Sequence, residues 1–249
     1  MRLDVQMAEM GLAKSRSKAR ELIEASAVKV DGVLVGKPSF DVVPESMIEL
    51  CREICPYVSR GGLKLEKALL EFAIDLHGVV CLDIGASTGG FTDCMLQHSA
   101  AKVYALDVGH GQLAESLRQD TRIVSLERTN IRTFDRSIIC EKVRFVSIDV
   151  SFISLTQVLP IVYSILNEGQ VVALIKPQFE CGREFVGKKG IVRDAKIHDM
   201  VTDKIRKSAE LCGFTVDGLI ESPITGGDGN VEFLILLKKG RDAICCESD

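Results

Sequence analysis

From residue 79 onward, apolar runs alternate with segments whose apolar residues recur at the spacing of a helix. The apolar runs fall at 79–84, 102–106, 143–148 and 171–175, and the amphipathic segments between them at 91–98, 112–119 and 155–166. Uninterrupted apolar runs are typical of strands that are buried on both faces. Their alternation with helices predicts a doubly wound, mostly parallel α/β sheet of the Rossmann-like kind, covered on both sides.

The flanking segments show other patterns. A helix is expected at 63–72 and a longer one at 195–212, and strands at 215–222 and 232–239 are expected to close the sheet as an antiparallel hairpin. The predicted domains are a small N-terminal α+β domain at 1–57, a linker at 58–62, the α/β domain at 63–241 and a frayed tail at 242–249.

The N-terminal segment predicts two short helices on either side of Gly11, because apolar residues recur there at helical spacing. Ser15 is the expected N-cap of the second helix, which should end near 25–27. Two short strands then flank Asp31-Gly32, a dipeptide that favours the tight turn of a β-hairpin, and 47–50 predicts a further strand.

Composition narrows the class of protein. The 249 residues hold 31 Lys and Arg against 35 Asp and Glu, a net charge of −4, so any contact with a polyanion must be a local patch. No secretory signal and no membrane-spanning run is expected. The nine cysteines are scattered without metal-ligand spacing, which predicts reduced thiols, no metal site and a cytoplasmic location.

A glycine-rich turn follows the first strand of the predicted sheet. Asp83 begins the pattern D-x-G-x-x-x-G-G, and Asp107 ends the next strand, where a carboxylate can bind ribose hydroxyls. The turn lacks the dinucleotide and P-loop patterns and resembles the first motif of S-adenosylmethionine-dependent methyltransferases, although an ordinary tight turn is the alternative. The expected cofactor contacts are Asp83, Gly85, Ala86, Ser87, Thr88, Gly89, Gly90, Phe91, Asp107, Val108, Thr129, Asn130 and Asp149.

Two ionisable residues come directly after apolar strands that end at this same edge. Asp149 follows one strand, and Lys176 follows another and precedes a proline. Core packing explains a lysine poorly at such a position, and the alternative is an outward-pointing lysine with a helix-capping aspartate. Lys64 and Glu232 complete a candidate set, although each alone would be an ordinary surface charge.

Several separated strings together make a family resemblance specific. They are YVSRGGLKLEKAL, DIGASTGGFTDCMLQ, YALDVGHGQL, DVSFISL, LIKPQFE, GIVRD and GNVEFLILL. They resemble the TlyA (haemolysin A) family of ribosomal RNA 2′-O-methyltransferases over essentially the whole chain. The wider group, similar to the FtsJ/RrmJ heat-shock RNA methyltransferases, uses a Lys-Asp-Lys-Glu tetrad, which the resemblance assigns to Lys64, Asp149, Lys176 and Glu232.

The resemblance implies S-adenosyl-L-methionine as cofactor and cytidine 2′-hydroxyls of ribosomal RNA, free or in ribosomal subunits, as substrate. A ribose hydroxyl must be aligned and lose a proton during the transfer, and Lys176 is the candidate for that activation. Asp149 is expected to orient Lys176, and Glu232 to position Lys64 or to contact the ribose. The nucleotide and the oligomeric state stay open.

The N-terminal segment carries a run of basic residues at the start of its second helix. In isolation this run is typical of a solvated helical face. The strings RLD, GLAKSRSKARELI and VKVDG resemble the RNA-binding domain of ribosomal protein S4, which implies a local RNA surface. The expected RNA contacts are Arg2, Lys14, Arg16, Lys18, Arg20, Lys29 and Arg60.

Three other functions compete with this interpretation. The name haemolysin suggests a cytolysin, but the sequence shows no export signal and no amphipathic insertion stretch. A small-molecule methyltransferase would not need the basic N-terminal module. A non-catalytic RNA-binding factor would not need an intact tetrad and glycine-rich loop.

Overall fold

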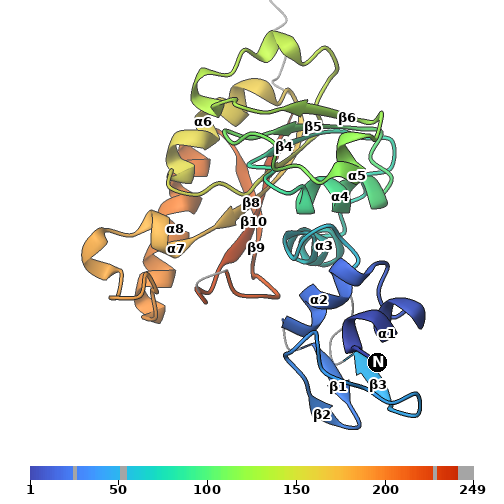
Figure 1. Ribbon diagram of the computed structural model, residues 1–249. Helices are drawn as coiled ribbons and strands as arrows, with labels where there is room; N and C mark the ends of the chain where they lie inside the picture. The colour runs from blue at the N-terminus through green and yellow to red at the C-terminus, as the bar shows by residue number, and fades with distance from the viewer. Residues whose placement is uncertain (25–26, 51–54, 227–228, 241–249) are drawn as a thin grey trace, which may run out of the picture. The chain divides into compact units, whose positions relative to one another are not determined.

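The computed structural model describes residues 1–24, 27–50, 55–226 and 229–240. The chain divides into two compact units, Met1–Cys55 and Pro56–Asp249 (Figure 1). The predicted tail at 242–249 lies outside the described residues. No helix in the described part of the chain is both long and apolar enough to cross a membrane.

Two helices open the first unit, as predicted. They are α1 (Leu3–Glu9) and α2 (Arg16–Glu24), and Gly11 between them has a φ of 71°. Ser15 Oγ accepts a hydrogen bond of 3.2 Å from the backbone N–H of Lys18, which is the capping contact expected of an N-cap serine. The expected end of the second helix near 25–27 includes residues 25 and 26, which lie outside the described residues.

A three-stranded antiparallel sheet completes this unit, in the order β2-β1-β3. Its strands are β1 (Val28–Val30), β2 (Val33–Leu34) and β3 (Ile48–Leu50). Asp31 and Gly32 have φ angles of 50° and 81°, and positive values at both central residues define the hairpin turn that this dipeptide predicts. The helices and the sheet share one core, formed by Leu3, Met7, Ala13, Ala19, Ile23, Val28, Val30, Val35, Val42 and Ile48.

The second unit is built on a seven-stranded sheet in the order β6-β5-β4-β7-β8-β10-β9. The strands are β4 (Val80–Ile84), β5 (Lys102–Leu106), β6 (Ile123–Leu126), β7 (Phe145–Ile148), β8 (Gly169–Ile175), β9 (Thr215–Glu221) and β10 (Phe233–Lys239). The first five are parallel, and β10 pairs antiparallel with both β8 and β9. The predicted doubly wound, mostly parallel fold is therefore confirmed.

Helices cover both faces of this sheet. They are α3 (Gly61–Glu71), α4 (Gly90–Gln97), α5 (Glu115–Arg118), α6 (Leu155–Ile165), α7 (Pro177–Glu180) and α8 (Ala195–Leu211), with short 3-10 turns at Ile131–Thr133, Arg136–Ile138 and Arg183–Phe185. α3 packs against α4 on one face, and α6 packs against α8 on the other (Figure 1). Because β4 to β8 are parallel, their carboxyl ends lie at one common edge of the sheet.

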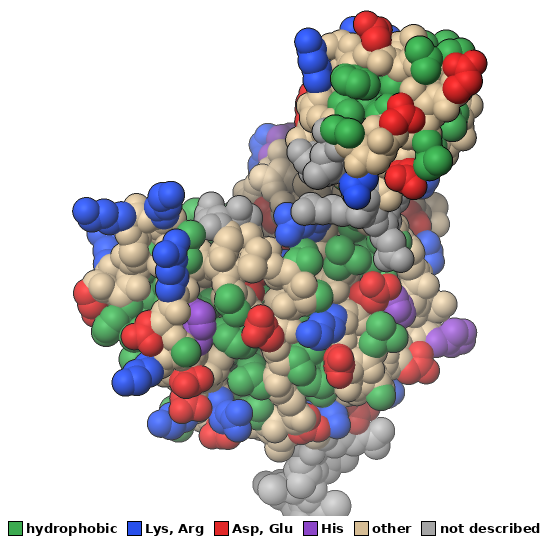
Figure 2. Space-filling view, turned by 90° about the horizontal axis from the view of Figure 1, so that it is seen from below, with side chains coloured by type: hydrophobic (Ala, Val, Ile, Leu, Met, Phe, Trp, Pro, Cys, Tyr) green, Lys and Arg blue, Asp and Glu red, His purple; other side chains and the backbone are tan. Residues whose placement is uncertain are grey.

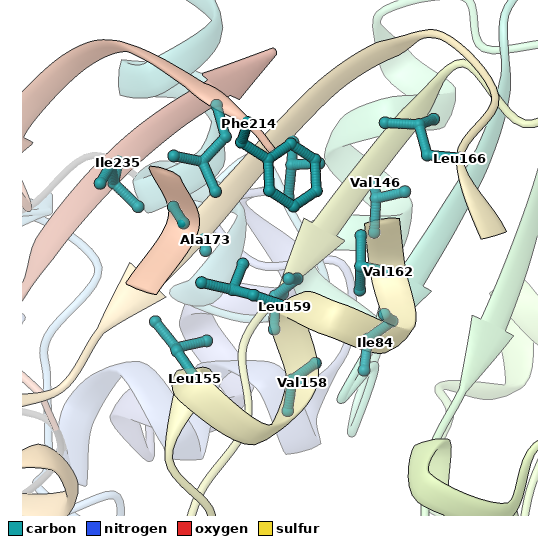
Figure 3. Close-up of a cluster of buried hydrophobic side chains, with 14 of the residues drawn as sticks. Ile84, Val146, Leu155, Val158, Leu159, Val162, Leu166, Ala173, Phe214 and Ile235 are labelled. Carbon is teal, nitrogen blue, oxygen red and sulfur yellow. The ribbon is translucent and has the colours of Figure 1, made fainter. Parts of the chain in front are cut away.

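The main core lies between the sheet and the helices α6 and α8. Apolar side chains of α6 meet side chains of several strands there (Figure 3). The residues labelled in that figure are Ile84, Val146, Leu155, Val158, Leu159, Val162, Leu166, Ala173, Phe214 and Ile235, and all are buried. Cys81 and Cys94 are buried free thiols in the same unit. The close packing of α6 and α8 against the sheet makes the strand ends a rigid support for the site.

The expected linker at 58–62 is part of the second unit, and the expected N-terminal boundary at residue 57 moves to Cys55. The Tyr57 ring is buried, and its hydroxyl donates a hydrogen bond of 2.7 Å to Glu66. The Val58 N–H donates one of 2.8 Å to Asp93. α3 starts at Gly61. Its second residue, Gly62, packs so closely on Tyr57 that a Cβ there would lie 2.2 Å from the ring. Tertiary packing fixes this segment although it has no periodic pattern of its own.

Candidate active site

The glycine-rich loop turns the chain from β4 into α4. Gly85 has a φ of 87°, and a Cβ there would lie 2.2 Å from the carbonyl oxygen of Asp149. Gly89 has a φ of 95° and directly precedes α4. A side chain is excluded at Gly85 by both its conformation and the backbone of the segment after β7. The loop therefore lies directly against the segment that carries Asp149.

Asp83 lies beneath this loop and is fully buried. Its carboxylate accepts hydrogen bonds of 2.6 Å from Thr92 Oγ1 and 2.8 Å from Ser147 Oγ, which join β4 to α4 and β7. Burial raises the pKa of Asp83 to about 6, and the two hydroxyl donors oppose this effect. The side chain lines neither of the cavities described below and supports the loop from beneath, and its contact with a cofactor stays a prediction.

Asp107 holds the loop from the other side. Its carboxylate accepts hydrogen bonds of 2.7 Å from the backbone N–H of Ser87 and 2.7 Å from that of Gly109. Each carboxylate oxygen has a second lone pair, so the group can still accept hydrogen bonds from a ligand. Asp107 therefore fixes the loop and also faces the space next to it.

A cavity of about 580 Å³ opens beside the loop, at the carboxyl ends of the parallel strands. This is where doubly wound sheets bind ligands. Asn130 lines it and accepts a hydrogen bond of 3.0 Å from the N–H of Arg132. The other lining residues are Ile84, Gly85, Ser87, Leu106, Asp107, Val108, Gln112, Ile131, Arg132, Asp149, Val150, Ser151, Phe152, Ile153 and Gln157.

Two lysine–carboxylate pairs stand at the same edge. Lys64 of α3 donates a buried hydrogen bond of 2.5 Å to Glu232, which directly precedes β10. Lys176 follows β8, and its Nζ lies 2.6 Å from Oδ1 of Asp149, which follows β7. The four residues that the sequence singles out are thus held as two ion pairs, and Glu232 positions Lys64.

A smaller pocket of about 260 Å³ lies beside the larger cavity; Lys176 and Glu232 line neither space, but their ion-pair partners line this pocket. Lys64 and Asp149 line it, and Asp149 borders both spaces together with Gly85 and Ser87. Of the other expected cofactor residues, Ala86, Thr88, Gly90 and Phe91 line this smaller pocket. Gly89 and Thr129 line neither space, and the Thr129 hydroxyl donates a hydrogen bond of 3.0 Å to the carbonyl oxygen of Glu127. Asp149 therefore stands between two adjoining binding spaces.

Comparison with known protein families gives a match to the FtsJ-like methyltransferase model over residues 57–239. The chain belongs to the FtsJ-like methyltransferase family. A second model, the S4 domain, matches residues 1–48 of this methyltransferase.

Similar proteins cover nearly all of the methyltransferase. It is 48% identical over 238 residues to "Putative rRNA methyltransferase YqxC" of Bacillus subtilis, with 95% of this chain and 85% of that protein covered. It is 42% identical to the 16S/23S rRNA (cytidine-2'-O)-methyltransferase TlyA of Mycobacterium tuberculosis, with 97% and 91% covered. A solved structure titled "Putative hemolysin from Streptococcus thermophilus" is 46% identical, covers 98% of this chain and 91% of its own, and superposes with a TM-score of 0.77.

The methyltransferase also exposes an aromatic ring at the rim of the larger cavity, which sequence reasoning missed. Phe152 is 91% exposed, has a φ of 64° and contacts Phe179, with ring centroids 4.9 Å apart. Its neighbour Ser151 accepts a hydrogen bond of 3.0 Å from Lys176 Nζ. Positive φ is uncommon for a bulky residue and is concentrated at functional sites. The string DVSFISL gives no local signal of this conformation.

Sequence reasoning also missed Glu180, a buried carboxylate at the end of α7. It accepts hydrogen bonds of 2.6 Å from Ser154 Oγ and 2.7 Å from the N–H of Leu155, at the start of α6. Lys204 of α8 donates one of 2.7 Å to its carbonyl oxygen. Glu180 thus ties the segment after Lys176 to the segment after Asp149. The sequence signal that could have indicated a buried carboxylate was the acidic residue at the end of the string LIKPQFE.

In the S4 domain, two of the expected RNA contacts surround a buried aspartate. Arg2 and Arg16 each donate a hydrogen bond to Asp4, at 2.9 and 3.0 Å. The hydrogen bonds and charges of the two guanidinium groups hold the pKa of Asp4 well below its usual range. Arg2 and Arg16 keep about half of their side-chain surface exposed. These two arginines therefore stabilise the fold and still face solvent.

The remaining expected RNA contacts are exposed or partly exposed. Lys18 pairs with Glu21 at 2.8 Å, one turn further along α2. Lys14 and Arg20 are exposed, and Lys29 is partly exposed on β1. Arg60 belongs to the second unit, where it lines the smaller pocket and donates a hydrogen bond of 3.5 Å to the carbonyl oxygen of Thr225. Arg60 is therefore a candidate contact for RNA at the pocket itself.

Proposed function

We propose that this protein transfers a methyl group from S-adenosylmethionine to the ribose 2′-hydroxyl of a cytidine in ribosomal RNA. The observation that carries the proposal is the arrangement of the tetrad. Lys64–Glu232 and Lys176–Asp149 form two ion pairs at one edge of the sheet, and Asp149 borders both the pocket and the larger cavity.

The residues around the larger cavity fit the cofactor. Asp107 follows β5, the position from which a carboxylate accepts hydrogen bonds from ribose hydroxyls. Val108, Ile131 and Ile153 provide apolar surface for a purine ring, and Asn130 provides a polar group beside it. A Cβ at Gly85 would collide with the backbone of Asp149, so the loop can take this path beside the cavity only when residue 85 is glycine. S-adenosylmethionine, when bound, supplies a methyl group that a sulfonium has already activated.

The tetrad supplies what a hydroxyl acceptor needs. A ribose hydroxyl is a weak nucleophile and must be aligned while its proton is removed. Lys176 is the group proposed to take this proton, as a neutral amine that has first released its own proton to solvent. Asp149 and Ser151 hold its nitrogen in a fixed position. Lys64 places a second cation at the pocket, where negative charge develops on the acceptor oxygen, and Glu232 holds it there.

Three further observations support RNA as the acceptor. The S4 domain match and its resemblance to a ribosomal RNA-binding domain suggest that the N-terminal unit brings RNA to the protein. The two curated relatives named above are named as ribosomal RNA methyltransferases. Phe152 exposes a ring face at the cavity rim, and aromatic rings of this kind stack with bases that have left a helix. Ribosomal subunits are therefore the proposed partners, and the cytoplasm the proposed location.

The test is transfer of labelled methyl from S-adenosylmethionine to ribosomal RNA. Substrates are unmodified transcripts of both large ribosomal RNAs and subunits from a strain that lacks the gene. Label in an alkali-resistant dinucleotide is the expected result, because a 2′-O-methyl group blocks hydrolysis of the adjoining phosphodiester. Label in a base would contradict ribose methylation. Cofactor binding without transfer to any of these substrates would favour the non-catalytic RNA-binding factor.

A further inference from the structure

A basic β-turn projects from the segment between α7 and α8, within the string GKKGIVRD that the tetrad does not use. The backbone N–H of Gly190 donates a hydrogen bond of 2.8 Å to the carbonyl oxygen of Gly187, and the N–H of Gly187 donates one of 3.1 Å to that of Ile191. Lys188 and Lys189 occupy the two central positions of the turn, and both are exposed.

Asn230 holds this turn in place from beneath. Its side chain is fully buried, donates a hydrogen bond of 2.9 Å to the carbonyl oxygen of Gly190 and accepts one of 2.9 Å from the N–H of Val192. Val192 is itself buried. A buried amide needs hydrogen-bond partners for its nitrogen and its oxygen. Here the nitrogen binds the last residue of the turn and the oxygen binds the backbone just after it. The two lysines therefore stand on a backbone that is fixed before any ligand arrives.

The turn lies at the edge of the sheet that carries the tetrad. β8 ends at Ile175 and α8 begins at Ala195, so the segment between them belongs to the carboxyl edge. β10 runs antiparallel to β8, which places its first residues at the same edge. Asn230 precedes Glu232 by two residues, so one short segment anchors both the turn and the Lys64–Glu232 pair.

Four cationic side chains lie in or near the turn, in a segment that also carries the carboxylates of Glu184 and Asp194. Arg183, Lys188, Lys189 and Arg193 are all exposed, and none of them forms an ion pair with a described residue. Figure 2 shows Lys and Arg side chains gathered at one margin of the second unit, on the side where Figure 1 places α7 and α8. Exposed cations that form no ion pair release counterions when they meet phosphates.

We infer that the Lys188–Lys189 turn is a phosphate-binding arm for the RNA strand whose ribose enters the tetrad pocket. The inference rests on the proposed function and adds a contact outside the S4 domain and the tetrad. Because Asn230 fixes the turn beforehand, binding does not pay the full entropy of ordering a loop. The arm contacts the backbone and not the bases, so it positions the substrate and does not select its sequence.

The test compares two double variants that lose the same charge. K188Q/K189Q removes the arm, and K142Q/K207Q removes two exposed lysines near the opposite edge, where β7 begins and α8 ends. We expect K188Q/K189Q to raise the KM for RNA about tenfold with kcat little changed, and to lower the slope of log affinity against log salt by about 1.5. The matched control should stay close to wild type, and K188R/K189R should restore most of the affinity.

Binding of a labelled unmodified transcript, followed by fluorescence anisotropy, separates this inference from the proposed function. Equal affinity and equal salt slope for K188Q/K189Q and its control would overturn the phosphate-binding arm, even when wild type transfers methyl normally. A selective loss of RNA affinity in K188Q/K189Q would support the arm, even when no RNA accepts methyl, and the proposed function alone would then fail.

Discussion

Among the described residues, each unit buries one aspartate completely, and the two units do so in opposite ways. In the S4 domain, Arg2 and Arg16 surround Asp4 and keep its pKa low. In the methyltransferase unit, Thr92 and Ser147 give Asp83 only hydroxyl donors, and burial raises its pKa to about 6. Partner cations offset more of the desolvation cost of a buried carboxylate than neutral donors do.

The difference shows how each unit relates its fold to its function. In the small unit, the arginines that stabilise Asp4 are also the proposed RNA contacts, so the proposed binding would use side chains that support the fold. In the larger unit, Asp83 supports the loop from below, while Asp149 lines the pocket and pairs with Lys176. Support and chemistry are therefore separate there, and substitutions should affect one without the other.

Lys176→Ala gives the largest expected effect and tests this separation directly. We expect the rate of methyl transfer to fall about 1,000-fold, because the proposed base is lost. Cofactor binding by calorimetry and RNA binding by anisotropy should stay near wild type, since Lys176 supports neither unit's core. Transfer within tenfold of wild type would remove Lys176 from the role of base.

Asp83→Asn tests the cost of the uncompensated carboxylate. A folded-state pKa of about 6, above that of the unfolded chain, means that this group's contribution to stability falls as pH rises from about 4 to 6 and stays low above that range. The fall is on the order of 3 kcal/mol. Urea unfolding at pH 4.5 and pH 7 should show a steeper loss for wild type than for the variant. Parallel behaviour of the two proteins would contradict a raised pKa.

Asp4→Asn tests the compensated carboxylate and should act with the opposite pH dependence. The lowered pKa of Asp4 means that its contribution is present above pH 4 and is lost as pH falls below that value. At pH 7 we expect the variant to destabilise the S4 domain by about 2 kcal/mol, less than a wholly buried pair would, because both arginines can be hydrated. RNA affinity should fall as well. Urea unfolding at pH 7 that is the same for the variant and wild type would contradict the predicted loss of stability.

Phe152→Ala gives the smallest of these effects. The ring is exposed, so we expect thermal unfolding to change little. Alanine keeps the Cβ, so the strain of the positive φ stays. Loss of a stacking surface should raise the KM for RNA about tenfold. Phe152→Tyr should retain wild-type KM, because it keeps the ring. Equal KM values for all three proteins would show that no base stacks at this position.

Much of the fold was predictable because its signals are local. Ser15 caps α2 and Asp31-Gly32 forms the hairpin turn, as their own side chains and conformations predict. The apolar runs gave the parallel strands, although β6 has a mixed burial pattern and was not predicted as a separate strand. The antiparallel pairing of β9 with β10 was predicted and is confirmed, but the pairing of β10 with β8 was not predicted, because periodicity identifies a strand and not all of its partners.

The sequence by itself determined the residue types of the site: the glycine loop, the carboxylate after β5 and the Lys-Asp-Lys-Glu set that a family resemblance marks. Only the tertiary structure decided that Lys64 pairs with Glu232, 168 residues away, and that Asp83 lies beneath the loop. It also decided that Ser59, Arg60 and Gly61 line the pocket and that Asn230 holds a basic turn. The physical reason is that backbone propensity acts over a few residues, whereas burial and hydrogen-bond pairing depend on distant segments that folding brings together.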